Sequence, residues 1–196
     1  ANHALTGPEV CSVLEEIACP GDLFVTQFEC DLEATFAAVE RAHHMGLYTI
    51  VNPAPAKELP DHVYRCIDLL VLNETEAQFL TGIPAEGAEN LHRALDWFRT
   101  RGVRNVIITL GDAGSIVCCD GQEFLVPARR VTVVDTPAAG DTYIGALAAS
   151  LSQGKSMEES TRFATAAAAL AIGHCGAQQS IPDQNTIEQF LKEESL

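Results

Sequence analysis

The sequence predicts an α/β fold in three layers, α/β/α, in which a mostly parallel β-sheet lies between helices. Two features predict this fold. Short apolar segments alternate along the chain with segments of helical periodicity, as in repeated strand–helix units. The apolar segments are hydrophobic almost without interruption, which is typical of parallel strands that helices bury on both faces. No linker, composition shift or internal repeat divides the chain, so we expect residues 1–196 to form a single domain.

The individual elements follow from periodicity and from the residues that stop helices. Leu32, Phe36 and Val39 share one face of a predicted helix, and a glycine ends it. Similar patterns predict strands at 22–27, 47–52, 66–73 and 105–111, and helices at 32–46, 74–82, 89–102, 140–153, 156–173 and about 184–193. Three shorter β segments suggest a local antiparallel excursion at one edge of the sheet, with a hairpin turn at "DGQ": 115–120, 123–128 and 131–135.

Composition excludes several classes of protein. The net charge is −15, from 27 acidic and 12 basic residues, which argues against a nucleic-acid or anionic-membrane partner. No apolar run approaches the roughly 20 residues that span a bilayer, and no secretory signal is recognisable. The seven cysteines are scattered and form no CxxC pair, so we expect small buried thiols in a reducing cytosol and no zinc cluster. These features predict a cytoplasmic protein.

Three polar segments lie where strands end or a helix begins: "LNETE" (72–76), "TLGDAG" (109–114) and "DTPAAGD" (135–141). Ligands of open parallel α/β sheets bind beyond the carboxyl ends of the strands. All three segments suit phosphate, so we expect the functional site there.

The segment "DTPAAGD" combines small residues with an acid at the start of a helix. Free N–H groups in a first helical turn attract anions, and small side chains let a phosphate approach the backbone. Asp141 would then accept a hydroxyl proton during attack on phosphorus. The alternative is that Asp141 only caps the helix.

The other two segments are each open to two interpretations. Asn73 and Glu76 have the spacing for a phosphate contact and a Mg²⁺-bound water, but the same spacing fits a capping box. Gly111 and Gly114 allow a phosphate to approach the backbone, but they also suit an ordinary turn. The glycines match neither a dinucleotide fingerprint nor a Walker A loop.

Together and in this order, the three segments resemble motifs of the ribokinase-like (PfkB) family of carbohydrate and nucleoside kinases. "DTPAAGDTYIGAL" is similar to the signature that carries the family's catalytic Asp and anion hole, "LNETE" to its NxxE motif, and "TLGDAG" to its nucleotide-binding TLGxxG. Within the family, "NPAPAKELP", "NETEAQFLTG" and "GAQQSIP" are most similar to segments of ribokinases.

The resemblance implies a role for particular residues. Asp141 would be the catalytic base, and the amides of Ala138, Ala139 and Gly140 would form the anion hole. Glu29 would bind the sugar together with Asp141. Residues implied to bind ATP and order its Mg²⁺ are Asn73, Glu76, Thr109, Gly111, Gly114, Gly140 and Thr165. Residues implied to hold an activating K⁺, largely through carbonyl oxygens, are Asp135, Pro137, Ala171, His174, Gly176 and Ser180.

Three departures from the family pattern qualify this assignment. Ala138 stands where most members have Gly, although ribokinases commonly carry AAGD, and Thr165 stands where an Asn or His often contacts adenine. The family's first, Gly-rich signature is absent. We therefore expect the chain to correspond to the C-terminal two-thirds of such a kinase, without the N-terminal strands, the β lid and the homodimer contact that the lid makes.

The implied function is transfer of the ATP γ-phosphoryl group to O5 of D-ribose, giving ribose 5-phosphate. The alternatives are another PfkB sugar or nucleoside kinase, and a non-catalytic ATP-binding module that lacks the lid and part of the sugar site.

Overall fold

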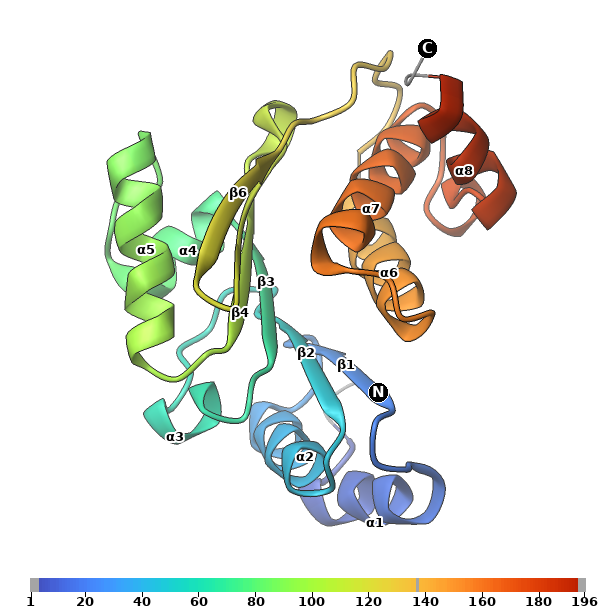
Figure 1. Ribbon diagram of the computed structural model, residues 1–196. Coiled ribbons are helices and arrows are strands. Elements are labelled where there is room, and N and C mark those ends of the chain that lie inside the picture. Colours follow the sequence, from blue (N-terminus) through green and yellow to red (C-terminus); the bar gives the residue numbers. More distant parts are fainter. Residues whose placement is uncertain (1–3, 137, 194–196) are drawn as a thin grey trace. The chain divides into compact units, whose positions relative to one another are not determined.

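The computed structural model describes residues 4–136 and 138–193 (Figure 1). They fall into two compact units. The first unit holds the chain up to Leu110 together with Ile116–Phe124, and the second holds Gly111–Ser115 and the chain from Leu125 onward. The short Gly111–Ser115 loop therefore belongs to the second unit, although strands of the sheet flank it in sequence.

The sheet has six strands in the order of the chain: β1 (Leu23–Gln27), β2 (Tyr48–Asn52), β3 (Leu69–Asn73), β4 (Asn105–Thr109), β5 (Ser115–Cys119) and β6 (Gln122–Val126). The pairs β1–β2, β2–β3 and β3–β4 are parallel. Between β5 and β6, Asp120 and Gly121 have φ of 47° and 82°, as a two-residue hairpin turn requires. The α/β class, the mostly parallel sheet and the turn at "DGQ" are confirmed.

In the part of the chain that the structure describes, five helices belong to the first unit and three to the second. The first unit contains α1 (Gly7–Ile17), α2 (Leu32–His44), α3 (Asp61–Tyr64), α4 (Glu74–Thr81) and α5 (Ala88–Thr100). The second contains α6 (Ala139–Ser152), α7 (Met157–Ile172) and α8 (Gln184–Glu193), with short 3₁₀ turns at Gly111–Ala113 and Gln178–Ser180. The chain that the structure describes has no helix that combines the length and apolar character needed to cross a bilayer.

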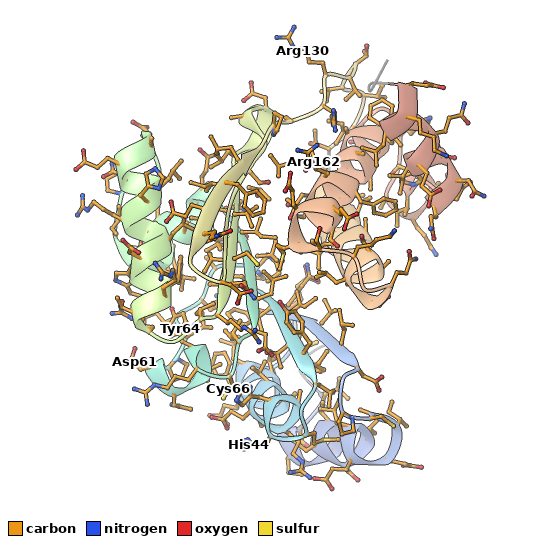
Figure 2. The ribbon with its side chains drawn as sticks, in the orientation of Figure 1. His44, Asp61, Tyr64, Cys66, Arg130 and Arg162 are labelled. Atoms are coloured by element: carbon orange, nitrogen blue, oxygen red, sulfur yellow. The ribbon has the colours of Figure 1, made fainter. Side chains whose placement is uncertain are left out.

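The core of the first unit forms between the strands and the helices. Apolar side chains of β2, β3 and β4 are almost completely buried, and Val39 of α2 and Leu95 of α5 pack in the same cluster. Tyr64 of α3, labelled in Figure 2, packs edge-to-face on Trp97, with ring centroids 5.8 Å apart. The second unit has a smaller core in which Ile187 of α8 packs with Ala166 and Ala167 of α7.

Three expectations about local structure and burial are wrong. Residues 131–135 form no strand, because the N–H groups of Val134 and Asp135 donate to Ile172 O, at the end of α7, over 2.8 and 3.1 Å. Helix α1 was not expected, although its Thr6–Glu9 capping box and early Pro are recognisable start signals. Cys19 and Cys175 are exposed, because each lies in a loop just after a helix.

Candidate functional site

The parallel strands of the first unit end in polar residues. The last residues of β1 to β4 are Gln27, Asn52, Asn73 and Thr109. Gln27 Nε2 donates to Asn52 Oδ1 over 3.1 Å, and Asn52 Nδ2 donates to Val71 O over 2.8 Å, so side-chain amides tie the ends of β1 and β2 to each other and to the middle of β3. Neither Gln27 nor Asn52 was predicted from the sequence. The sequence feature that could have identified them is that each one ends an apolar strand.

Glu29, the expected sugar ligand, lies in the short loop between β1 and α2. Its neighbour Phe28 is buried and packs edge-to-face on Phe36, with ring centroids 5.6 Å apart. The Phe28 N–H donates to Ala54 O over 2.9 Å, while Glu29 itself is exposed. The loop thus presents a carboxylate to solvent beside an anchored residue, and a carboxylate there can accept hydrogen bonds from sugar hydroxyls.

Asn73 and Glu76 form a capping box at the start of α4. Asn73 Oδ1 accepts from the Glu76 N–H, and Glu76 Oε2 accepts from the Asn73 N–H, both over 2.9 Å. Burial raises the pKa of the Glu76 carboxyl above its ordinary value, and the hydrogen bonds from Asn73 offset part of the increase. The capping interpretation is confirmed. The cap does not use the Asn73 side-chain NH₂ group, which suits a phosphate oxygen.

Thr109, Gly111 and Gly114 differ in what surrounds them. The Thr109 hydroxyl donates to Leu72 O over a long distance of 3.5 Å. Gly111 has φ +54°, and a Cβ built on it meets nothing within 4 Å. Gly114 has φ +102°, and its Cβ would lie 2.0 Å from Val126 O. Gly114 is therefore required by a close backbone approach, whereas Gly111 leaves open space where a ligand can approach the backbone.

The start of α6 has no side-chain cap. Ala138 occupies the N-cap position, and the Ala139 N–H donates to Thr136 O over 3.2 Å. Gly140 follows with helical backbone and no heavy atom within 4 Å of an ideal Cβ, so the space beside it is open. Asp141 is exposed in the first turn and is not the N-cap residue. A long helix that begins in this way attracts an anion to its N-terminus.

Buried hydroxyl groups lie close to this turn in sequence and along α7. Thr142, directly after Asp141, is 3% exposed, and its hydroxyl has no hydrogen-bond partner among the described residues. Such a group is often satisfied by a ligand or an ordered water. The Thr165 hydroxyl donates to Thr161 O over 2.8 Å within α7.

The residues expected around a monovalent cation gather where α7 ends. Gly176 N–H donates to Asp135 Oδ2 over 3.2 Å, and His174 N–H donates to Ala171 O over 3.1 Å. Ser180 is buried nearby in sequence, with its hydroxyl on Ala177 O at 2.7 Å. Carbonyl oxygens at a helix C-terminus carry partial negative charge and suit a hard cation. The described residues thus fit K⁺, whereas Pro137, also expected there, lies outside them.

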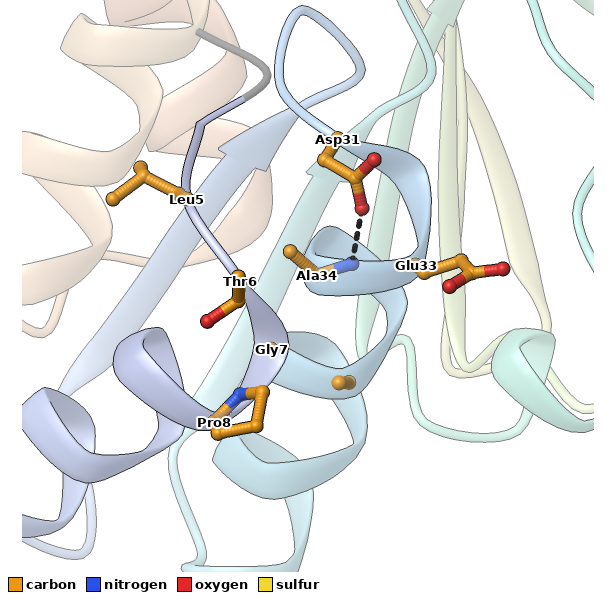
Figure 3. Close-up of a pocket in the computed structure, with 8 residues that line it drawn as sticks. Leu5, Thr6, Gly7, Pro8, Asp31, Glu33 and Ala34 are labelled. Atoms are coloured by element: carbon orange, nitrogen blue, oxygen red, sulfur yellow. Dashed lines mark hydrogen bonds between the residues drawn. The ribbon is translucent and has the colours of Figure 1, made fainter.

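Neither a metal-binding cluster nor the cavity described below brings predicted site residues together in the part of the chain that the structure describes. No cluster of three or more His, Cys, Asp or Glu side chains occurs among them. A cavity of about 490 Å³ lies between the starts of α1 and α2 (Figure 3). The Asp31 carboxylate that lines it already caps α2, accepting from the Ala34 N–H over 2.9 Å.

The predicted residues therefore divide between the two units. Glu29, Asn73, Glu76 and Thr109 belong to the first. The Gly111–Ser115 loop, the start of α6, Thr165 and the residues expected around K⁺ belong to the second.

Comparison with known proteins identifies the class. The sequence matches the pfkB family of carbohydrate kinases over residues 14–184. It is 35% identical to ribokinase of Staphylococcus aureus over 190 residues, which is 96% of this chain and 62% of that protein. It is also 35% identical to deoxyribokinase of Salmonella typhi over 198 residues, which is 100% of this chain and 63% of that protein.

Solved structures agree. Ribokinase from Thermotoga maritima matches with a TM-score of 0.86 and 34% identity, over 98% of this chain and 63% of that one. Arabidopsis thaliana ribokinase, complexed with ribose and ATP, matches with a TM-score of 0.83 and 32% identity, over 87% of this chain and 55% of that one. The chain belongs to the pfkB family of carbohydrate kinases. It spans less than two thirds of the length of these relatives.

Proposed function

We propose that this protein transfers the γ-phosphoryl group of ATP to O5 of D-ribose, giving ribose 5-phosphate and ADP. One observation carries the proposal: in a chain of the carbohydrate kinase family, an exposed Asp141 follows a helix start that has no side-chain cap and only small residues. That combination supplies a proton acceptor next to a site for phosphate.

In the proposed step, Asp141 accepts the proton of the ribose O5 hydroxyl. O5 then forms a bond to the γ-phosphorus, and the bond between that phosphorus and the oxygen bridging to the β-phosphate breaks. The electron pair of that bond leaves with ADP, and the proton on Asp141 passes to water. General-base assistance of this kind contributes about 10²- to 10⁴-fold in rate.

The first turn of α6 stabilises the charge on the group being transferred. The amides of Ala138, Ala139 and Gly140 act at the positive end of a 14-residue helix whose N-cap residue, Ala138, makes no side-chain hydrogen bond to them. Asn73, Thr109, Gly111, Gly114 and Thr165 contribute contacts to the nucleotide, as their match to the family's motifs implies. Glu29 binds sugar hydroxyls.

Two ions complete the proposal. Glu76 would orient the water shell of a bound Mg²⁺ through the carboxylate oxygen that the capping box leaves over, and that ion would supply neutralisation of phosphate charge. Carbonyl oxygens of Asp135, Pro137, Ala171, His174 and Gly176, together with Ser180, would hold a K⁺ ion, which would supply compensation of negative charge when bound. We further propose a cytoplasmic protein whose homodimer contact lies outside these residues.

The choice of sugar has one competitor with a specific observation in its favour. The chain is as similar to a deoxyribokinase as to a ribokinase, at 35% identity to each. Glu29 can accept from hydroxyls common to both sugars, so 2-deoxy-D-ribose is the second candidate substrate.

The test is ATP-dependent phosphorylation of D-ribose and of 2-deoxy-D-ribose, each with K⁺ and with Na⁺, beside an ATP-binding titration of the same sample. K⁺-stimulated turnover of ribose, with weaker turnover of the deoxy sugar, is the expected result. ATP binding without turnover would instead make this chain a nucleotide-binding module. A sample that does not bind ATP would overturn the proposed function altogether.

A further inference from the structure

Tyr143 places a phenol inside the second unit, two residues after Asp141. Its side chain is 6% exposed, and a buried tyrosine hydroxyl needs a hydrogen-bond partner. The hydroxyl donates to Ser115 Oγ over 3.5 Å. Burial raises the pKa of Tyr143 to about 12, and hydrogen bonds to Ser115, Thr165 and Thr161 offset only part of that rise. The phenol therefore remains a neutral donor at physiological pH.

Among the described residues that hydrogen-bond this phenol, Ser115 lies outside the helices. The hydroxyls of Thr161 and Thr165 donate to α7's own carbonyls, Met157 O and Thr161 O, over 2.7 and 2.8 Å. Ser115 is 1% exposed and directly follows Gly114, at the end of the Gly111–Ser115 loop. The Tyr143–Ser115 contact thus joins α6 to the loop that carries two of the expected nucleotide contacts.

A second contact holds the same loop from another side. Gly114 packs so closely on the backbone of residues 126–128 that a Cβ would lie 2.0 Å from Val126 O and 2.6 Å from Ala128 N. The end of the loop is therefore restrained through Gly114 by backbone and through Ser115 by Tyr143.

The position of Tyr143 on α6 determines what this contact restrains. Two steps along an α-helix turn through about 200°, so Tyr143 and Asp141 lie on opposite sides of it. Tyr143 is buried and Asp141 is exposed, as that geometry requires. Anchoring the phenol therefore sets the rotation of the first turn, and with it the direction of Asp141. Errors of about 1 Å in such positions cost about 10²-fold in rate.

We propose that Tyr143 is a positioning residue, whose hydroxyl holds the Gly111–Ser115 loop and the first turn of α6 in the relative geometry that ATP requires. This inference rests on the proposed function, since it assigns both segments to the same nucleotide. The inference adds to the proposed site a residue that touches neither ATP nor sugar.

A matched control lies in the same pair of helices. Ser160 Oγ on α7 donates to Ser150 Oγ on α6 over 3.0 Å, and both residues are buried. Ser150 is seven residues beyond Tyr143, about 10 Å along the helix. Ser160→Ala therefore removes a buried hydroxyl between α6 and α7 without touching the Gly111–Ser115 loop.

The experiment compares the full chain with Tyr143→Phe, Ser115→Ala, the double variant and Ser160→Ala. The measurements are the melting temperature, the Kd for ATP, and amide hydrogen exchange of residues 111–115. Tyr143→Phe and Ser115→Ala are each expected to weaken ATP about fivefold and to speed exchange in the loop by a similar factor. The double variant should be no worse than either single one. Ser160→Ala should lower the melting temperature comparably but leave Kd within twofold.

Each other outcome is decisive. If wild type binds ATP and Tyr143→Phe binds it equally well, the inference fails and the proposed function stands. An equal loss of affinity in Ser160→Ala would reduce Tyr143 to a structural role. If wild type does not bind ATP, the proposed function fails and the inference fails with it. Where wild type turns over, KM for ATP should rise in Tyr143→Phe, and kcat should fall because the direction of Asp141 is no longer fixed.

Discussion

Helices α4 and α6 both begin at segments where the sequence suggested phosphate, but the two starts are built in opposite ways. At α4, Asn73 and Glu76 hydrogen-bond each other's backbone N–H groups and form a complete capping box. At α6, the N-cap is Ala138, no side chain caps the turn, and the space beside Gly140 is open. The first start is satisfied by its own side chains, whereas the second has an N-cap residue that makes no side-chain hydrogen bond.

The difference separates two roles that look alike in a sequence. A capped helix start gains stability and has fewer N–H groups to offer, whereas an uncapped start gives up that stability, about 1 kcal/mol, and keeps its positive end accessible. We therefore assign chemistry to the start of α6 and chiefly support to the start of α4. The predictions below test that division.

Asp141→Asn should have the largest effect. The amide cannot accept the hydroxyl proton, so turnover should fall by about 10²- to 10⁴-fold. The affinity for ATP should hold or improve, because a negative charge next to the phosphate site is removed. Steady-state kinetics and an ATP titration measure the two effects. Asp96→Asn, which removes a carboxylate from a surface ion pair, is the control and should change neither. An Asp141→Asn enzyme with near-normal turnover would show that Asp141 is not the base.

Gly140→Ala should move stability and function in opposite directions. A Cβ there meets nothing, and alanine favours a helix over glycine by about 1 kcal/mol, so the melting temperature should rise. The same methyl group would occupy space that the phosphate needs, so kcat/KM should fall at least tenfold.

Gly145→Ala is the matched control for that change. Gly145 lies in the same helix, and its Cβ would also meet nothing within 4 Å. It should give the same gain in stability, measured by thermal melting, with unchanged kinetics. If both variants retain full activity, the start of α6 does not hold the phosphate.

Much of the fold could be predicted from the sequence because its signals are local. Apolar strands and glycine-stopped helices alternate along the chain, and the structure has both within a few residues of the expected positions. The error at 131–135 has a tertiary cause. The apolar "VTVV" pattern suits a strand, but the backbone of Val134 and Asp135 bonds to the end of α7, which no local pattern reveals.

The distinction between local signals and tertiary contacts also applies to the candidate site. Asn73, Glu76 and the small residues before Asp141 stand in short motifs, so their positions could be read directly. The roles of Gln27 and Asn52 could not be predicted in this way, because the two side chains hydrogen-bond to each other across 25 residues of sequence. Tyr143 was part of a recognised segment, yet its partner Ser115 is 28 residues distant and only folding joins them.

Asn73→Ala should have a moderate effect, and mainly on stability. It removes the oxygen that accepts the Glu76 N–H, which should cost about 1 kcal/mol in the free energy of unfolding. Asn73→Ser keeps a capping oxygen and should recover most of that loss in denaturant unfolding. Both variants lack the side-chain NH₂ group. An equal loss of ATP affinity in the two variants would therefore measure how much this NH₂ group contributes to ATP binding, separately from the cap. Unchanged affinity in both would leave α4 with a purely structural start.

Glu76→Gln should have the smallest effect on stability, and that effect should depend on pH. The folded protein holds the pKa of Glu76 above its ordinary value, chiefly through burial, so the charged carboxylate is less favourable there than in the unfolded chain. The stability that Glu76 contributes is therefore fully present below its unfolded pKa and is lost as pH rises through the higher folded pKa. Glutamine keeps an accepting oxygen for the Asn73 N–H but carries no charge. The stability of Glu76→Gln relative to wild type, measured by urea unfolding, should therefore improve from pH 4 to pH 7.

The exposed capping box at the start of α7 provides the control. There, hydrogen bonds from Ser156 lower the pKa of Glu159, so Glu159→Gln should show the opposite trend. Parallel trends in the two variants would mean that burial does not distinguish the start of α4 from an ordinary surface cap.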